Sequence, residues 1–141
     1  MLEPLFEEKQ LQVRLSTDDE VPLLSLNKDR MNQVIYNLLN NAIRYVPCGG
    51  AVFIQSRLRR LKNGQRVEIC IADSGPGISH QDVPHIFEYF YRAEKSRNRK
   101  SGGSGIGLAL ARQYVINQGG SIRVHSKEGK GTIFTICFPV L

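Results

Sequence analysis

The feature that most constrains this sequence is a long helical pattern that begins near Asn27 and ends before Pro47. Apolar residues recur along it at the spacing of one face of an α-helix, whereas Asn37, Asn41 and Arg44 fall together on nearly the opposite side. Asn27 is a candidate N-cap, and the proline stops the helix. Such a helix must bury its apolar side against another layer, and its polar side faces either solvent or a ligand. The apolar side comprises Ile35, Leu38, Leu39, Ala42 and Val46.

Alternating apolar and polar residues predict the strands of that second layer. Asn63-Gly64 is typical of a hairpin turn, so the strands on either side of it should run antiparallel. A second long helix is expected over Gly105 to Asn117, closed by Gly119-Gly120. With no repeat and no linker, we expect one α+β domain over residues 1–141, a mixed, mainly antiparallel sheet covered on one face by helices. The expected strands are Leu11–Leu15 with one face buried, a strand that starts at Val52, Val67–Ala72, Ser121–His125 and Thr132–Phe138.

The composition is that of an ordinary globular domain. A chain of 141 residues with 41% hydrophobic and 23% charged residues can bury a core without disulfides or metals. No apolar run approaches the length of a membrane span, and the N-terminus has no signal-peptide pattern. The three cysteines, which show no Cys-x-x-Cys spacing, are expected to be reduced and buried, and the three histidines lack zinc-ligand spacing with them. We therefore expect a cytoplasmic location. The cysteines are Cys48, Cys70 and Cys137.

Much of the net charge of +6 is local, in a basic run just before a glycine-rich stretch. That cluster fits the neighbourhood of a triphosphate, or a merely solvated loop, as well as it fits DNA. The segment Tyr91 to Ser104 has almost no apolar content, and long loops in compact domains are usually mobile lids or binding loops. The basic residues are Arg92, Lys95, Arg97, Arg99 and Lys100.

Glycine-rich motifs adjoin two of the expected elements, one after a strand and one before a helix. Asp73-Ser74-Gly75-Pro76-Gly77-Ile78 comes directly after an apolar strand, and taken alone it is a good turn in which the aspartate caps the first glycine. The run Gly102–Leu108 leads straight into the second helix, where free N–H groups and the helix dipole favour an anion, most often phosphate. Together with a later Gly129-Lys130-Gly131-Thr132, their order is a strong indication of an anion site, most often one for phosphate.

At these motifs the sequence resembles the catalytic ATP-binding domain of bacterial sensor histidine kinases. That fold is shared with gyrase-type ATPases, the ninety-kilodalton heat-shock chaperone and mismatch-repair ATPases, and the resemblance covers nearly the whole chain. It implies a Bergerat-type α/β sandwich. The matching boxes, in the order of the family, are the N box Asn37–Asn41, the first glycine box Asp73–Gly77, the F box Ile86–Arg92, the second glycine box Gly103–Leu108 and the third Gly129–Thr132.

The resemblance implies ATP and Mg²⁺ as ligands. Asp73 would accept a hydrogen bond from the exocyclic amine of adenine, because a carboxylate is acceptor-only and so selects that amine over the carbonyl of guanine. Asn41 would bind Mg²⁺ through its amide oxygen, and Asn37 would support the water shell of the metal or a phosphate. For Arg44 and Arg92, the alternative to a phosphate-binding role is that they are simply charged residues at the surface. The residues that would reach phosphates or ribose are Arg44, Tyr45 and Arg92.

Backbone groups and apolar side chains would complete the pocket. Gly75 and Gly77 would shape the adenine side, and the glycines of the second glycine box would cradle the phosphates. Phe87 and Phe90 are expected to pack and to anchor one end of the lid. Thr132 would close the pocket behind adenine, unless it is simply the first residue of a strand. The phosphate-binding glycines are Gly103, Gly105 and Gly107, and the other residues expected beside the nucleotide are Ile78, Phe90, Ile106, Leu108 and Thr132.

Three classes of function are compatible with such a site. A histidine kinase would hand the γ-phosphoryl group of ATP to a histidine, a hydrolytic ATPase or protein-serine kinase would use water or a hydroxyl, and a regulatory module would do no chemistry. Relatives of the second class usually carry glutamate as general base where Asn37 stands, and an amide cannot take a proton. A neutral histidine needs no such base, so transfer to histidine is favoured. A regulatory module is disfavoured because the metal and phosphate residues are all present.

The phosphoacceptor is not expected on this chain. His80, His85 and His125 are not in the setting of the family, which is a histidine followed by an acidic residue on a long dimerisation helix. We therefore expect the catalytic part of a larger sensor kinase, inactive in isolation, with the dimerisation and phosphoacceptor domain and a response regulator as partners. Nucleic acid is not an expected partner. The chain alone is expected to be a monomer and the parent, whether or not anchored in a membrane, a homodimer.

Overall fold

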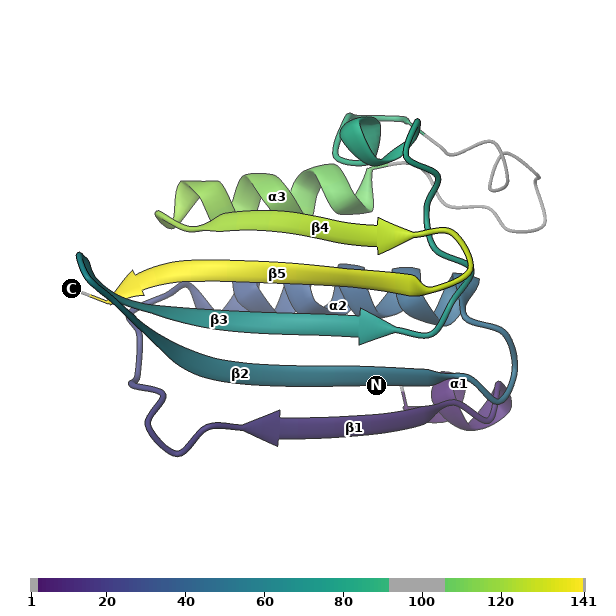
Figure 1. Cartoon of the computed structure of the whole chain (residues 1–141), viewed down its shortest axis with the longest axis horizontal. Helices are drawn as coiled ribbons and strands as arrows, with labels where there is room; N and C mark the ends of the chain where they lie inside the picture. Colours follow the sequence, from purple (N-terminus) through teal and green to yellow (C-terminus); the bar gives the residue numbers. More distant parts are fainter. Residues whose placement is uncertain (1–2, 92–105, 141) are drawn as a thin grey trace.

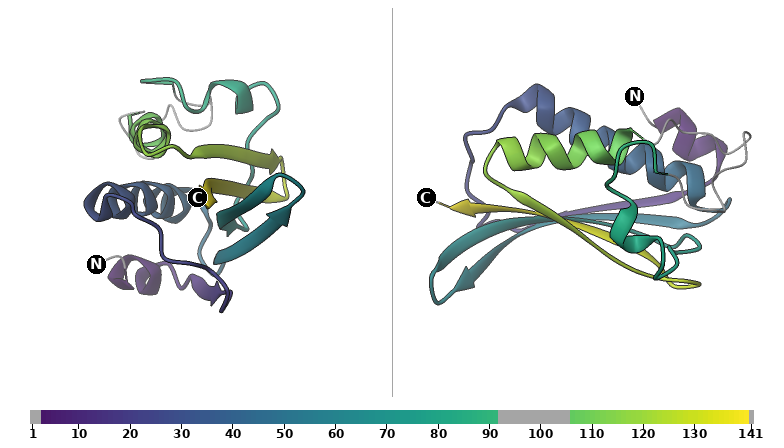
Figure 2. Two further views of the ribbon diagram at one scale, coloured as in Figure 1. Left: turned by 90° about the vertical axis from the view of Figure 1, so that its left-hand side faces the viewer. Right: turned by 90° about the horizontal axis from the view of Figure 1, so that it is seen from above.

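The computed structural model describes residues 3–91 and 106–140, which form a five-stranded sheet with helices on one face (Figure 1). Viewed along the strands in Figure 2, the helices lie on one side of the sheet and leave the other side open. The predicted α+β architecture is confirmed. The elements are α1 (Glu3–Glu8), β1 (Gln12–Thr17), α2 (Lys28–Tyr45), β2 (Ala51–Leu61), β3 (Gly64–Asp73), the 3₁₀ helix η1 (Val83–His85), α3 (Gly107–Asn117), β4 (Ser121–Lys127) and β5 (Gly131–Val140).

The sheet has the strand order β1-β2-β3-β5-β4. β1 pairs parallel with β2, since α2 carries the chain across between them, and the other neighbouring strands pair antiparallel. The sheet is thus mixed and mainly antiparallel, as predicted. The predicted hairpin joins β2 to β3, but its turn is Lys62-Asn63, one residue earlier than expected, because Leu61 already pairs with Gly64.

Helix α2 fills the centre of the helical layer. Its N-cap is Asn27, as predicted, with the side chain accepting a hydrogen bond from the backbone N–H of Arg30 at 3.0 Å. The helix contacts both the sheet and α3, so the stripe that it buries is wider than the expected one, and Ile35 lies only half-buried at its margin. The buried residues of this stripe and cap are Val34, Leu38, Leu39, Ala42, Ile43 and Val46.

The hydrophobic core lies between α2, α3 and the covered face of the central strands. Phe134 and Ile136 of β5 and Ile71 of β3 face Leu38 of α2 and Val115 of α3, and all five are almost completely buried. Burying a side chain of this size contributes about 1.5–3 kcal/mol. This core fixes the ends of α2, β3 and β5 relative to one another.

One expectation about the secondary structure was wrong. All six residues of β1 are exposed, so no face of that strand is buried, because β1 lies at an edge that the helices leave uncovered; the buried contact is made by Leu11 instead. Between Gln81 and Phe90 the only regular helix is the short 3₁₀ helix η1. Pro84 lies inside it, and proline lacks the N–H that a longer helix would need.

Other expectations concern the cysteines and membrane spans. All three cysteines carry free thiols, but the expected burial holds only for Cys137, since Cys70 is half-buried and Cys48 is exposed. Within the described ranges, no helix combines the length and the apolar character that crossing a bilayer requires.

Candidate functional site

Several of the motifs singled out in the sequence meet at one end of the sheet. The C-terminal ends of α2 and β3, the start of α3 and the turn between β4 and β5 all lie at the right-hand side of Figure 1. At this end Asp73 pairs with Thr132 of β5, and a side-chain atom added at Gly75 would come within 3.7 Å of the carbonyl oxygen of Tyr45. The N box and the first and third glycine boxes therefore border one region.

Asp73 is the last residue of β3, and its side chain is half-buried. Its Oδ1 accepts a hydrogen bond from the N–H of Gly75 at 2.8 Å, which is the turn-capping contact that the sequence left open. Burial raises the pKa of this carboxyl group, and the backbone N–H groups of Gly75 and Thr132 offset that rise only in part. Within the described residues Asp73 forms no ion pair, so its charge is met by neutral donors alone.

Two glycines allow backbone segments to approach one another more closely than any side chain would permit. A methyl group on Gly77 would lie 2.2 Å from the carbonyl oxygen of Lys127, and one on Gly131 would lie 2.1 Å from that of Asp73. Both glycines also have positive φ, at +77° and +92°. The N–H of Gly129 donates to the carbonyl of Pro76 at 2.8 Å. The first glycine box is thus held directly against the β4–β5 turn.

Ser126 joins the same two segments and was missed in the sequence. Its hydroxyl accepts from the N–H of Ile78 at 2.8 Å, donates to the carbonyl of Gly131 at 3.0 Å and lies 2.8 Å from the hydroxyl of Thr132. A signal was available, because Ser126 continues the covered face of β4 after Ile122 and Val124, where an apolar residue would be expected. Thr132 is 6% exposed, and its hydroxyl pairs with that of the half-buried Ser126.

The N box is tied to the start of α3 through Asn37. Its amide nitrogen donates to the carbonyl of Gly107 at 3.1 Å, and its amide oxygen accepts from the side chain of Gln33 at 3.1 Å. Helix α3 begins after Ile106, a residue with no side-chain acceptor to cap it. Leu108 packs partly against the core. The structure thus brings the beginning of α3 beside the polar side of α2.

The other polar residues of α2 follow Asn37 on the same helix. Asn41, Arg44 and Tyr45 are half-buried, and their side chains make no hydrogen bond or ion pair with the part of the chain that the structure describes. The last turn of α2 has a partner from outside the motifs, because the Lys9 ammonium group donates to the carbonyls of Ile43 and Arg44. A cation there matches the negative end of the helix dipole.

The two phenylalanines of the F box differ. Phe87 packs edge-on against Phe134 with ring centroids 6.1 Å apart, as expected of an anchoring residue. Phe90 was also expected to pack, but it is 70% exposed and has a left-handed backbone with a φ of +65°. Arg92, Gly103 and Gly105 lie outside the described residues, as does the expected lid beyond Tyr91.

Comparisons with known proteins agree with this arrangement. The chain matches the model of the family described as "Histidine kinase-, DNA gyrase B-, and HSP90-like ATPase" over residues 26–141. The sensor-like histidine kinase SenX3 of Mycobacterium tuberculosis is 45% identical over 105 residues, which are 74% of this chain and 25% of SenX3. The sensor histidine kinase WalK of Bacillus subtilis is 39% identical over 116 residues, 82% of this chain and 19% of WalK. The chain therefore spans a quarter or less of the length of these relatives.

Solved structures show the same fold. The mycobacterial sensor histidine kinase MprB superposes with a TM-score of 0.78 at 30% identity, covering 98% of this chain and 90% of that one. Full-length ShkA, solved in complex with AMPPNP, gives a TM-score of 0.80 at 25% identity over 98% of this chain and 27% of ShkA. The chain belongs to the histidine kinase-, DNA gyrase B- and HSP90-like ATPase family, among the catalytic ATP-binding domains of sensor histidine kinases.

Proposed function

We propose that this domain binds ATP with Mg²⁺ where Asp73 lies, and that within a larger parent protein it donates the γ-phosphoryl group to a histidine on a separate dimerisation domain. The observation that carries the proposal is the state of Asp73, a half-buried carboxylate met by backbone N–H groups and by no described cation. It lies at the end of the sheet where the N box and glycine boxes of an ATP-binding family meet.

The chemistry of Asp73 fits adenine. An ionised carboxylate only accepts hydrogen bonds, so it can bind the exocyclic amine of adenine, whereas the corresponding carbonyl of guanine offers no donor. A desolvated carboxylate without a counter-charge gains more from such a donor than an exposed one. Gly77 and Gly131 keep the backbone close behind this group, which supports a narrow pocket for a planar base.

The side chains of the N box fit a magnesium ion bound mainly through phosphates and water. Asn41 offers an amide oxygen that no described group occupies, and Mg²⁺ commonly takes only one or two protein oxygens beside phosphate. Within residues 3–91 and 106–140, no three carboxylate, histidine or cysteine side chains converge as a metal site. When bound, the ion would neutralise phosphate charge. Asn37 would act beside it by holding the start of α3.

The phosphates are assigned to the N-terminal end of α3. Gly107 begins that helix, and Gly103 and Gly105 precede it in the sequence. Backbone N–H groups at such a position bind phosphate oxygens well. The other residues proposed to border the nucleotide are Arg44, Tyr45, Ile78, Phe90, Arg92, Ile106, Leu108 and Thr132.

Transfer to a histidine is favoured over hydrolysis by the contacts of Asn37. Its amide nitrogen and its amide oxygen both have protein partners, and an amide cannot accept a proton from water. The histidines of the chain do not supply an acceptor on a long helix, since His85 lies in η1, His125 lies in β4 and His80 lies in the loop before η1. We therefore assign the acceptor to a dimerisation domain outside this chain, with a response regulator as the next partner and a cytoplasmic location.

A thermal-shift series tests the nucleotide specificity. At a hundredfold excess over Kd, a ligand of the native state adds about 2.7 kcal/mol, which raises Tm by on the order of 5–15 °C for a domain of this size. ATP and ADP should give this shift and GTP should not. Asp73→Asn should lose the shift with ADP, while the matched variant Glu68→Gln on the same strand should keep it. Equal shifts with GTP would contradict the assignment of Asp73.

A phosphorylation assay tests the division of labour. The chain with labelled ATP should neither label itself nor hydrolyse ATP, because positioning of the acceptor supplies much of the catalysis in phosphoryl transfer. Addition of the dimerisation domain of the parent should produce an acid-labile label on that domain. Asn41→Ala should abolish it by removing the proposed magnesium ligand. Steady hydrolysis by the chain alone, or an acid-stable label on a serine, would favour an ATPase or serine kinase instead.

A further inference from the structure

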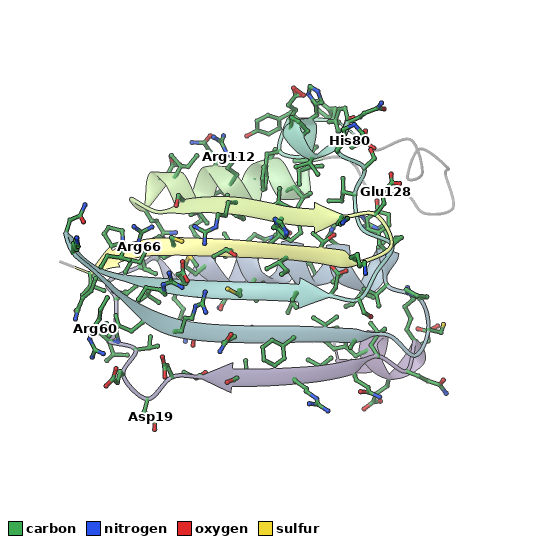
Figure 3. The ribbon with its side chains drawn as sticks, viewed as in Figure 1. Asp19, Arg60, Arg66, His80, Arg112 and Glu128 are labelled. Carbon is green, nitrogen blue, oxygen red and sulfur yellow. The ribbon has the colours of Figure 1, made fainter. Side chains whose placement is uncertain are left out.

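The open face of the sheet carries a cluster of arginines at the end opposite Asp73. Because Val67 and Ile71 of β3 are buried, the alternate residues Arg66 and Glu68 point to the other face, away from the helices. Figure 3 looks onto this face, with Arg66 labelled near the hairpin end of β3. The cross-strand partners in the same two rows are Arg57 and Arg59 of β2 and Cys137 and Pro139 of β5, with Ser121 of β4 beside Cys137.

The one carboxylate of this cluster, that of Glu68, already forms ion pairs through both of its oxygens. Glu68 has a side-chain exposure of 3%, and its Oε1 lies 2.9 Å from the Arg57 guanidinium while its Oε2 lies 3.3 Å from that of Arg123. The Nε of Arg57 adds a hydrogen bond of 3.0 Å to the same Oε1. Both oxygens of Glu68 are therefore engaged by Arg57 and Arg123, and Arg59 interacts with this carboxylate only through its charge, without a direct ion pair.

Two arginines of the cluster form no ion pair with the described part of the chain. Arg59 and Arg66 stand directly opposite each other in the register of β2 and β3, an arrangement of like charges that destabilises a sheet. Neither forms an ion pair within the described part of the chain, whereas the neighbouring Arg60, on the other face, reaches Glu20 at 2.9 Å. The charge of Glu68 offsets part of this repulsion at Arg59, and no described carboxylate lies within ion-pair distance of Arg66. Like charges that the fold offsets only in part are expected at functional sites.

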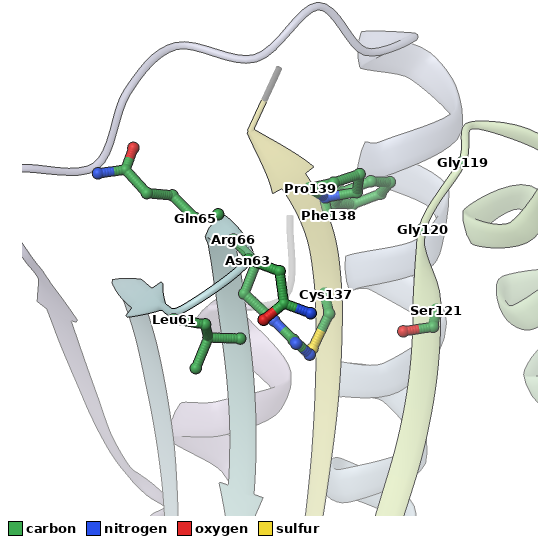
Figure 4. Close-up of a pocket in the computed structure, with 11 residues that line it drawn as sticks. Leu61, Asn63, Gln65, Arg66, Gly119, Gly120, Ser121, Cys137, Phe138 and Pro139 are labelled. Carbon is green, nitrogen blue, oxygen red and sulfur yellow. The ribbon is translucent and has the colours of Figure 1, made fainter.

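A hollow adjoins this pair. It has a volume of about 300 Å³, at the lower end of the range for small-molecule sites. Figure 4 shows Asn63 and Arg66 reaching toward the same point beside Cys137, with Ser121 on the adjacent strand. The polar side chains that line the hollow include amide, guanidinium and hydroxyl donors, and its apolar walls are Leu61, Phe138 and Pro139.

We propose that this hollow is a binding site for an oxyanion, a carboxylate or phosphate group held by the guanidinium group of Arg66, with Asn63 and Ser121 as neutral donors. Arg59 stands opposite Arg66 outside the lining of the hollow and adds its positive charge. Guanidinium is donor-only and matches the geometry of such anions with two parallel hydrogen bonds. A bound anion would also remove the repulsion between the two arginines. Arg66 is separated from Asp73 by roughly 23 Å along β3, so this site is distinct from the proposed nucleotide site.

Amide chemical shifts during anion titration test the proposal. The protein in chloride buffer at constant ionic strength would be titrated with inorganic phosphate, with citrate and with a glutamate-rich hexapeptide. Saturable shifts are expected at Gly64–Arg66 and Gly119–Ser121. Saturation by phosphate or citrate supports a free small anion, and saturation by the peptide alone supports carboxylates of a protein. Shifts confined to Gly75–Ile78, or no saturation with any of the three, would overturn the proposal.

Matched variants distinguish binding at this site from non-specific attraction of anions to the positively charged domain. Arg66→Gln should lower the affinity for the anion by roughly tenfold or more, since a hydrogen bond to a charged group is lost. Arg60→Gln removes the same charge from the opposite face and should leave the affinity unchanged. Equal weakening in both variants would overturn the proposal. As a second measurement, Arg66→Gln should raise Tm in the absence of anion by relieving the repulsion with Arg59, and citrate should raise Tm less in this variant than in the wild-type protein.

Discussion

Two acidic residues of β3, Asp73 and Glu68, are five positions apart and lie on opposite faces of the sheet. Burial alone would raise both pKa values. For Glu68 the hydrogen bond and charge of Arg57, with the charges of Arg59 and Arg123, outweigh burial and lower the pKa. For Asp73 no described cation is present, and its pKa is raised. An acid that the protein neutralises stabilises the fold, whereas an acid left without a counter-charge is available to a ligand.

The largest effect on stability is expected from a substitution that forces apart the backbone segments packed at Asp73. Gly131→Ala would place a methyl group 2.1 Å from the carbonyl oxygen of Asp73 at a φ of +92°, and should destabilise the domain by about 3–5 kcal/mol in urea unfolding. The control is Gly129→Ala, which also has a positive φ but no atom within 4 Å. Its cost should be about 1 kcal/mol, from the left-handed backbone alone. Equal losses would show that the close approach to Asp73 contributes nothing.

Removing the charge of Glu68 should have the next largest effect. Glu68→Gln leaves Arg57 and Arg123 beside a neutral amide and should lower the free energy of unfolding at pH 7 by about 1.5–3 kcal/mol. Because the folded pKa of Glu68 is lowered, this contribution is present above the unfolded pKa and is lost as the pH falls through the folded value. Glu20→Gln, at the exposed pair with Arg60, should change stability by less than about 0.5 kcal/mol. A comparable loss in both variants would refute a special role for the buried acid.

Removing the charge of Asp73 should have the smallest effect on the stability of the nucleotide-free protein. The change should be opposite in sign to that expected for Glu68→Gln. A raised folded pKa means that the charged form is disfavoured by folding, so stability is lost as the pH rises through that value. Asp73→Asn keeps an acceptor for the N–H of Gly75 and should leave stability at pH 7 unchanged or raise it by up to about 1 kcal/mol. Urea unfolding at pH 4 and pH 7 gives the comparison. A clear loss of stability at pH 7 would place Asp73 with Glu68 as a structural acid.

The comparison also shows what the sequence could reveal. Local signals sufficed for the cap at Asn27, the extent of α2 and the motif of Asp73, since each depends on neighbours within a few residues. Glu68 could be assigned only in part. Arg57 faces it across the predicted hairpin, but its second partner, Arg123, lies on β4, a strand that is separated from β3 by β5. The contact of Lys9 with α2 depends in the same way on tertiary packing.

The exposure of β1 has a different cause. The alternation of Val13 and Leu15 is a real strand pattern, and it places both side chains on the helix-bearing side of the sheet beside Val52 and Ile54. Whether that side is covered at the edge depends on how far the helical layer extends, which no local pattern encodes. The sequence motifs likewise named the glycines of the site but not Ser126, whose hydroxyl links two of the glycine boxes.

The strand order β1-β2-β3-β5-β4 also bears on how the site forms during folding. The β2–β3 and β4–β5 hairpins each close over a short turn, but Asp73 meets Thr132 only when the two hairpins pair through β3 and β5. Such long-range pairing forms late, because the entropy of closing the long intervening loop must be overcome first. A nucleotide held at Asp73 would therefore find no complete site in a partly folded chain. Its binding should slow unfolding and leave the rate of folding nearly unchanged.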